Sequence, residues 1–242
     1  MIDISIIVPV KNEAENIASV AKELDAVMNR CSWTWECIWV DDGSTDGSLS
    51  IIEAIADADP HHRFISFEKN AGQSAAFCAG FREARGRVLA TLDGDGQNDP
   101  ADIPFLVEIV LSGRADMANG YRRMRRDGLV RKVSSRVANG FRNLVTGKTV
   151  RDVGCSTRAF RRECAEDLPM FAGMHRFFPS LVAMRGYTLA EAPVNHRPRL
   201  RGTSKYGIGN RLWVGLLDTF GVWWLRRRAF SYRIAKRADT EG

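Results

Sequence analysis

Two carboxylates stand one residue apart at the end of an apolar stretch. Residues 88–92 read VLATL, and Asp93 and Asp95 follow directly, with Gly94 between them. Asp often opens turns and caps helices, and this role suits three acidic residues at expected helix starts, Asp46, Asp99 and Asp102. Two carboxylates this close repel unless a cation lies between them, and oxygen ligands suit Mg²⁺ or Mn²⁺. Because Mg²⁺ is usually held by one or two carboxylates together with substrate phosphates, the pair predicts a metal site for a phosphate-bearing substrate.

Polar residues also follow the first two predicted strands, at 5–10 and 36–40. They are Asn12, Glu13, Asp41 and Asp42. In an open α/β sheet, ligands bind at the edge formed by the carboxyl ends of the strands. The sequence therefore predicts one acidic rim that these residues share with the carboxylate pair.

The elements that must position this rim alternate along the first half of the chain. Strands are predicted at 5–10, 36–40, 63–68 and 88–92, and helices at 13–28, 48–58, 74–84 and 100–111. This alternation indicates an α/β fold with a mostly parallel central sheet and helices on both faces. Neither GxGxxG nor GxxxxGK[ST] occurs, so neither a dinucleotide-binding fold nor a P-loop is favoured.

The distribution of charge limits the kinds of partner that the protein can bind. The formal net charge is +6, and basic residues are concentrated at 120–142, where a single Asp opposes them, and at 226–228. Such runs are either solvated faces or sites for an anionic partner: nucleic acid, a phosphorylated substrate or a membrane surface.

The five cysteines form no CxxC pair, so no zinc site or disulfide framework is expected. The first residues resemble a strand rather than a signal peptide, which predicts a reducing, cytoplasmic location.

Five segments, taken in order, carry a resemblance to a known family. They are IIVPVKNEAENI (6–17), VDDGSTDGS (40–48), NAGQSAAFCAG (70–80), LDGDGQNDPADIP (92–104) and RGTSKYG (201–207). They strongly resemble inverting family 2 glycosyltransferases of GT-A fold, and more narrowly the dolichyl- or polyprenyl-phosphate sugar transferases. The resemblance implies a GT-A catalytic domain at 1–211 and a C-terminal amphipathic segment at 212–242. It also implies that DGD at 93–95 is the family's DxD motif, which holds Mg²⁺ or Mn²⁺ against a nucleotide-sugar diphosphate.

The same resemblance assigns roles to individual residues. The nucleotide-sugar would be bound by Pro9, Asn12, Glu13, Asp41, Asp42, Asp93, Gln97 and Arg122. The metal would be held by Asp93, Asp95 and Gln97, and the acceptor phosphate by Arg131, Arg136, Ser204 and Lys205. The catalytic set would be Asp95, Asp152 and Arg131, with Asp152 serving either as a base or only to orient the sugar. Lys11 stands where many relatives have Tyr, and the Gln after the DxD motif favours UDP-sugars over GDP-mannose.

The implied reaction transfers a sugar from a UDP- or GDP-linked donor to a polyprenyl phosphate. A phosphate monoester has a second pKa near ~6, so its attacking oxygen is already anionic at neutral pH. One alternative is transfer to a hydroxyl of a glycan or glycolipid, which requires a positioned base. A remote alternative is a non-catalytic basic module that binds nucleic acid or membrane, but the acidic rim argues against it and no nucleic-acid partner is expected.

The segment at 212–225, LWVGLLDTFGVWWL, lies between Arg211 and the basic run at 226–228. As a helix it would rise ~21 Å, short of the ~30 Å hydrocarbon core of a bilayer, and Asp218 lies in its middle. Its tryptophans and flanking arginines predict a helix at the interface of an anionic membrane, on the inner face. The alternatives are a core helix packed on the catalytic domain and a homo-oligomer contact.

Overall fold

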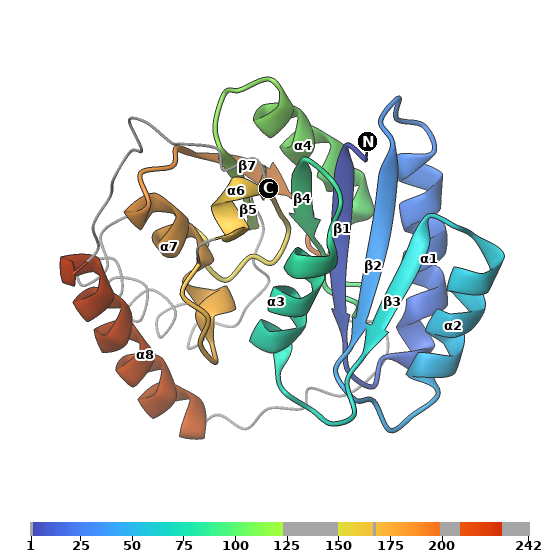
Figure 1. Cartoon of the computed structure of the whole chain (residues 1–242), viewed down its shortest axis with the longest axis horizontal. Helices are drawn as coiled ribbons and strands as arrows, with labels where there is room; N and C mark the ends of the chain where they lie inside the picture. The colour runs from blue at the N-terminus through green and yellow to red at the C-terminus, as the bar shows by residue number, and fades with distance from the viewer. Residues whose placement is uncertain (1, 123–149, 167, 199–208, 229–242) are drawn as a thin grey trace, which may run out of the picture.

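The computed structural model describes residues 2–122, 150–166, 168–198 and 209–228 (Figure 1). Within the last range, side chains are described at 215 and 217–228. Four predicted acceptor-phosphate residues lie outside the described part of the chain: Arg131, Arg136, Ser204 and Lys205.

Seven described strands form one mixed sheet. They are β1 (Ile4–Val10), β2 (Trp35–Asp41), β3 (His62–Ser66), β4 (Val88–Thr91), β5 (Met117–Arg122), β6 (Arg158–Arg161) and β7 (Leu189–Val194), in the order β3-β2-β1-β4-β6-β5-β7. The strands β1 to β4 pair in parallel, β6 runs antiparallel to both of its neighbours, and β7 is parallel to β5. The predicted α/β class with a mostly parallel sheet is confirmed.

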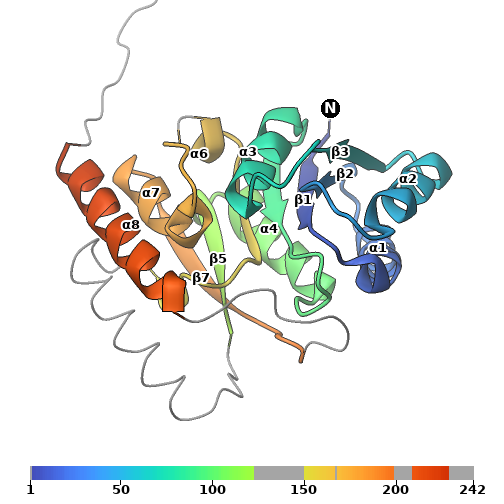
Figure 2. The same cartoon turned by 90° about the horizontal axis from the view of Figure 1, so that it is seen from below.

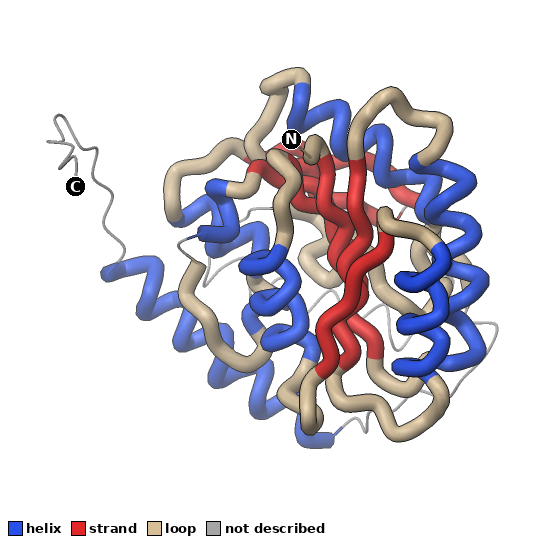
Figure 3. Tube along the Cα trace, turned by 45° about the vertical axis from the view of Figure 1, so that its right-hand side comes forward, coloured by secondary structure: helices blue, strands red, loops and turns tan. Residues whose placement is uncertain are grey.

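Helices cover both faces of this sheet, as Figure 3 shows. The described helices are α1 (Ala14–Met28), α2 (Ser48–Ala58), α3 (Gln73–Glu83), α4 (Ile103–Leu111), α6 (Glu163–Glu166), α7 (Phe178–Met184), α8 (Gly209–Arg228) and the 3-10 turns η1 (Pro100–Asp102) and η2 (Met174–Arg176). Successive strand residues point to opposite faces, so Ile6 packs with α1 and α4 while Ile7 packs with α3 and α7. The strand β1 is buried throughout because both of its faces are covered.

The predicted elements agree with the structure to within one or two residues at most boundaries. The third strand ends at Ser66 rather than 68, and the bond from the Phe67 N–H to the Asp41 carbonyl is the last one that joins it to β2. Asp99 caps η1 by accepting from the Ala101 N–H at 3.1 Å, as predicted. Asp102 stands at the N-cap position of α4, as predicted, but its carboxylate makes no capping bond there and accepts from the Asn195 N–H instead.

The helix α8 lies along the outside of α7 (Figures 1 and 2). It begins at Gly209, just before the expected boundary at 212. Val222 is fully buried against the domain, and Asp218 forms an ion pair with Arg176 at 3.2 Å. Within the described residues, no helix has the length and apolar character that crossing a membrane requires.

Candidate active site

The sheet order creates a switch point between β1 and β4. From β1 the chain proceeds outward through β2 to β3, and β4 then pairs with the opposite side of β1. Crossovers that leave in opposite directions open a crevice beyond the carboxyl ends of the two strands, and ligands of open α/β sheets bind in such crevices. Asn12 and Glu13 follow β1 at this edge, and Asp93 and Asp95 follow β4. The predicted acidic rim therefore lies at one end of the sheet.

Asp93 is held by two side chains from distant parts of the sequence. Its Oδ2 accepts from Ser156 Oγ at 2.5 Å, and its Oδ1 accepts from Gln73 Nε2 at 3.0 Å. Burial, followed by the negative charge of Asp95, raises the pKa of Asp93 to about 6, although the Ser156 hydrogen bond opposes this rise. Asp95 Oδ1 accepts from the Gln97 N–H at 3.1 Å, which folds the loop back on itself.

These residues fit a divalent cation chemically. Burial and, after it, the negative charge of Asp95 raise the pKa of Asp93, and a cation between the two carboxylates would relieve their repulsion. Asp93, Asp95 and Gln97 offer the hard oxygen donors that Mg²⁺ and Mn²⁺ prefer. Gly94 allows the loop to approach β1 closely, because a Cβ there would lie 3.1 Å from Val10 Cγ2 and 3.2 Å from the Pro9 carbonyl oxygen.

Asp41 and Asp42 use their carboxylates to organise neighbouring loops. Asp41 accepts from Ser66 Oγ at 2.9 Å, and Asp42 accepts from the Ala71 N–H at 2.6 Å and the Gly72 N–H at 2.9 Å. Both acidic residues are buried. The Asp42 contacts fix the start of α3, the helix that presents Gln73 to Asp93. Their predicted contact with the base or ribose stays a prediction.

The turn after β1 interlocks with the loop after β2. Asn12 has a positive φ of 50°, a sparsely populated conformation, and its Oδ1 accepts from the Thr45 N–H at 2.7 Å. Lys11 Nζ donates to the Gly43 carbonyl, so Lys11 also holds this loop. Pro9 is buried within β1, in register with Val40, and Glu13 Oε2 accepts from Asn16 Nδ2 at 2.7 Å.

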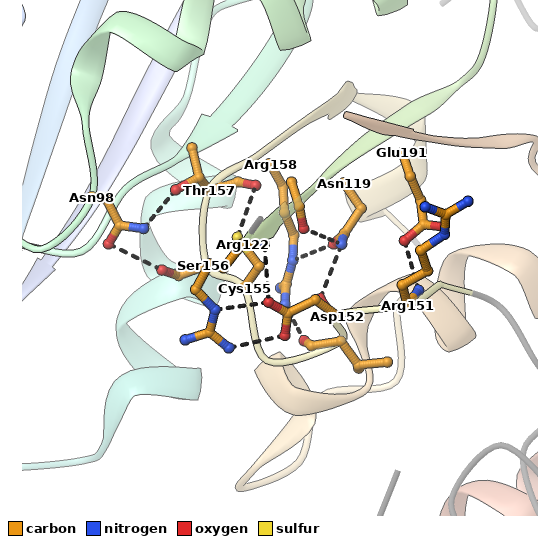
Figure 4. Close-up of polar contacts among 12 residues, drawn as sticks. Asn98, Asn119, Arg122, Arg151, Asp152, Cys155, Ser156, Thr157, Arg158 and Glu191 are labelled. Atoms are coloured by element: carbon orange, nitrogen blue, oxygen red, sulfur yellow. Dashed lines mark hydrogen bonds and ion pairs between the residues drawn. The ribbon is translucent and has the colours of Figure 1, made fainter. Parts of the chain in front are cut away.

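Arg122 and Asp152 form a two-point ion pair (Figure 4). Arg122 Nε donates to Asp152 Oδ2 at 2.7 Å, and Nη2 donates to Oδ1 at 2.9 Å. Both side chains are largely buried, at 16% and 12% exposed. The sequence resemblance assigned Arg122 to binding the nucleotide-sugar and Asp152 to a position by the sugar, and the structure brings the two together. Asp152 is therefore a carboxylate paired with arginine, and its predicted role as a base or in orienting the sugar stays a prediction.

The sequence analysis missed Gln73 and Ser156, which hold Asp93, and also Arg158. Arg158 is buried, and its guanidinium donates to Asn119 Oδ1 at 3.0 Å and to the Val153 and His175 carbonyls (Figure 4). Burial lowers the pKa of Arg158 to about 10, and the nearby negative charges oppose this effect. The available signal was the polar run CSTR at 155–158, which precedes the apolar residues of β6.

A second acidic group, Asp25, Asp59 and His62, has metal-compatible spacing near the amino-terminal end of β3, at the opposite edge of the sheet. Its hydrogen bonds argue against a metal there. Trp39 Nε1 donates to His62 Nδ1 at 3.0 Å, so His62 Nε2 carries the ring proton and donates to Asp25 at 2.8 Å. Nε2 then has no lone pair to offer a cation. We interpret this group as a hydrogen-bonded structural cluster.

Comparison with known proteins places the chain in a family. Residues 5–168 match the family described as glycosyl transferase family 2, and the chain belongs to this family. It is 36% identical to a dodecaprenyl-phosphate galacturonate synthase from Rhizobium johnstonii over 93% of this chain and 68% of that protein. It is also 36% identical to an undecaprenyl-phosphate 4-deoxy-4-formamido-L-arabinose transferase from Yersinia pestis over 85% of this chain and 63% of that protein. The chain thus spans about two thirds of the length of these relatives.

Solved structures agree on the fold. Glucosyl-3-phosphoglycerate synthase from Mycobacterium tuberculosis, in complex with Mg²⁺ and uridine diphosphate, aligns with a TM-score of 0.68 at 21% identity. The alignment covers 90% of this chain and 79% of that one. A complex of the same synthase with Mn²⁺, uridine diphosphate and glucosyl-3-phosphoglycerate aligns with a TM-score of 0.66. The expected GT-A fold is confirmed.

Proposed function

We propose that this protein transfers a sugar, with inversion, from a nucleotide-sugar to a polyprenyl phosphate. The observation that carries the proposal is the carboxylate pair Asp93 and Asp95 at the switch point of a family 2 glycosyltransferase fold. The names of the relatives, which specify dodecaprenyl and undecaprenyl phosphate, support this acceptor class.

The reaction is an in-line displacement at the anomeric carbon. An acceptor phosphate oxygen forms the new bond to that carbon while the bond to the nucleoside diphosphate breaks, and the diphosphate departs with the bonding electrons. Asp93, Asp95 and Gln97 would hold Mg²⁺ or Mn²⁺, which when bound neutralises charge on the departing diphosphate. The donor pocket would be completed by Pro9, Asn12, Glu13, Asp41 and Asp42.

The ion pair between Arg122 and Asp152 favours a phosphate acceptor over a hydroxyl acceptor. A hydroxyl must lose a proton to a positioned base, and both oxygens of the Asp152 carboxylate already accept hydrogen bonds from Arg122. A phosphate oxygen is already anionic and needs only charge compensation. We assign Asp152 to orienting the sugar, and Arg131, Arg136, Ser204 and Lys205 to the acceptor phosphate.

We further propose that α8 docks this protein on an anionic membrane surface, where its lipid acceptor resides. Leu217, Phe220 and Trp224 recur at helical spacing and are 70%, 53% and 56% exposed. Thr219 and Val222 are buried, so α8 packs by one face and presents an apolar second face. Basic residues at 226–228 end the helix. Each basic residue near an anionic surface contributes ~1 kcal/mol to the free energy of membrane binding. This peripheral attachment would place the protein at the cytoplasmic face.

The experiment incubates purified protein with short polyprenyl phosphates and a panel of UDP- and GDP-sugars. We expect a lipid-linked product from one donor in the presence of Mn²⁺ or Mg²⁺ and none after addition of EDTA. Sugar transfer to added glycans or glycolipids, with none to the lipid phosphate, would replace this proposal by the hydroxyl-acceptor alternative.

A further inference from the structure

The three residues after β7 pair with the loop that carries the predicted metal ligands. The Arg197 N–H donates to the Gln97 carbonyl at 2.8 Å, and Gln97 Nε2 donates back to the Arg197 carbonyl at 3.4 Å. Asn98 and His196 form an antiparallel bridge beside these contacts. Gln97 uses its amide nitrogen in this contact, so a cation would bind its amide oxygen.

The Arg197 side chain stabilises this pairing through two ion pairs. Its Nη1 lies 2.5 Å from Glu23 Oε2 on α1, and its Nη2 lies 2.9 Å from Asp99 Oδ1. The hydrogen bond with Glu23 is the largest of the contributions that raise the pKa of Arg197. A planar guanidinium can bridge two carboxylates in fixed directions, whereas a lysine ammonium is a single point charge. Arg197 therefore joins α1 to the residues just beyond Gln97.

Asn195 strengthens the same junction. Its N–H donates to Asp102 Oδ2 at 2.7 Å, and its Nδ2 donates to Asp99 Oδ2 at 3.0 Å. Asp99 thus receives both Asn195 and Arg197 while it caps η1. Asp99 and Asp102, which follow the DxD motif, thus both hold the segment after β7.

We propose that Arg197 is a positioning residue for the metal site. The loop from Asp93 to Gln97 is held at its first end by Ser156 and Gln73 and at its far end by Arg197. Without the Arg197 bridge, the Gln97 end loses its tie to α1, and the ligand oxygens are less well oriented before a cation arrives. The inference rests on the proposed function in assigning a cation to this loop.

The test measures Mn²⁺ binding by electron paramagnetic resonance, with and without UDP, alongside thermal unfolding. Loss of an outer contact to metal ligands typically weakens metal binding about 10- to 100-fold, and we expect a loss in this range for Arg197→Gln. The Mn²⁺ affinity of Arg197→Lys should lie between that of the wild type and that of Arg197→Gln. The matched control is Arg161→Gln, because Arg161 also pairs with two carboxylates, Asp116 and Glu163, but lies beside Val88 at the opposite end of β4.

The possible outcomes distinguish a failure of the Arg197 proposal from a failure of the proposed function. If Arg197→Gln and Arg161→Gln leave Mn²⁺ binding equally unchanged, while Asp95→Asn removes it, Arg197 is only structural and the proposal is overturned with the proposed function intact. If wild-type protein shows no Mn²⁺ binding that Asp95→Asn removes, the metal assignment fails, and the positioning role fails with it.

Discussion

At the scale of single residues, the two carboxylates of the DxD motif have different environments. Asp93 is fixed by Ser156 and Gln73, whereas the Asp95 carboxylate accepts from the Gln97 N–H within its own loop. We expect Asp95→Asn to lower turnover about a hundredfold or more with little change in thermal unfolding, because a charge that balances the cation and diphosphate is lost. Steady-state kinetics measure this. Near-normal turnover of the variant, or full activity in EDTA, would rule out the metal role.

The raised pKa of Asp93 gives a pH prediction. In the folded protein without metal this carboxyl binds its proton near pH 6, and in the unfolded chain only near its ordinary value of 3.8. Between these values the folded state binds more protons, so this residue adds stability as the pH falls and loses it as the pH rises through 6. Mn²⁺ needs the ionised form, so its affinity should weaken as the pH falls through about 6.

Ser156→Ala checks the origin of this effect. The Ser156 hydrogen bond lowers the pKa of Asp93, so its removal should move the pH midpoint of Mn²⁺ binding upward. Calorimetric titration at several pH values measures the midpoint. A midpoint that stays in place in Ser156→Ala and also in Asp93→Asn would contradict the assignment to Asp93.

Some site residues could be predicted from the sequence and others could not. Asp93 and Asp95 are visible because their spacing alone implies charge repulsion. Ser156 and Arg158 could not be predicted, because no local pattern marks their contacts. Ser156 lies 63 positions from its partner Asp93, and Arg158 lies 39 positions from its partner Asn119. Arg122 and Asp152 were each recognised by resemblance, but only the fold reveals that they pair.

At the scale of elements, the start of α3 depends on one buried carboxylate. Asp42 accepts from two backbone N–H groups, of Ala71 and Gly72, and from Asn70 Nδ2. Hydrogen bonds to a charged group contribute about 1.5–3 kcal/mol, so Asp42→Ala should lower the free energy of unfolding by about that amount. Asp57→Ala on the exposed side of α2 is the control, with an expected change within about 0.5 kcal/mol. Equal denaturant midpoints for the two variants would contradict this role.

The exposed face of α8 gives a second prediction at this scale. Replacing Leu217 and Trp224 together by serine should reduce flotation with anionic vesicles and leave thermal unfolding nearly unchanged, because both side chains face outward. Phe105→Ser, on α4, removes a similarly exposed ring and should leave flotation unchanged. If both variants float as the wild type does, α8 does not bind membrane, and the oligomer or core alternatives gain support.

The elements differ in how visible they are in the sequence. The first four strands are apolar runs that end at polar turns, and their positions were predicted closely. The strands β5, MANGYR, and β6, RAFR, carry polar residues whose burial depends on a contact between them, Asn119 with Arg158. Period and propensity do not detect such strands, since their polar side chains are satisfied only after the sheet forms.

At the scale of the whole molecule, the order of the strands determines where the chemistry is located. The reversal beside β1 brings Asn12 and Glu13 to the same edge as Asp93 and Asp95. Alternating strands and helices predicted the sheet, but the pairing order follows from the three-dimensional structure and the family. The helix α8 lies on the face covered by α3 and α7, and its second face, with Leu217 and Trp224, is exposed.

The chemical nature of the product tests the central claim most directly. The product made from short polyprenyl phosphate should be analysed by mass spectrometry, proton NMR of the anomeric centre and mild-acid treatment. We predict a sugar joined through its anomeric carbon to the lipid phosphate, with configuration opposite to that in the donor, released by mild acid and absent from Asp95→Asn reactions. An acid-stable glycoside on a hydroxyl, or a product with retained configuration, would contradict the account.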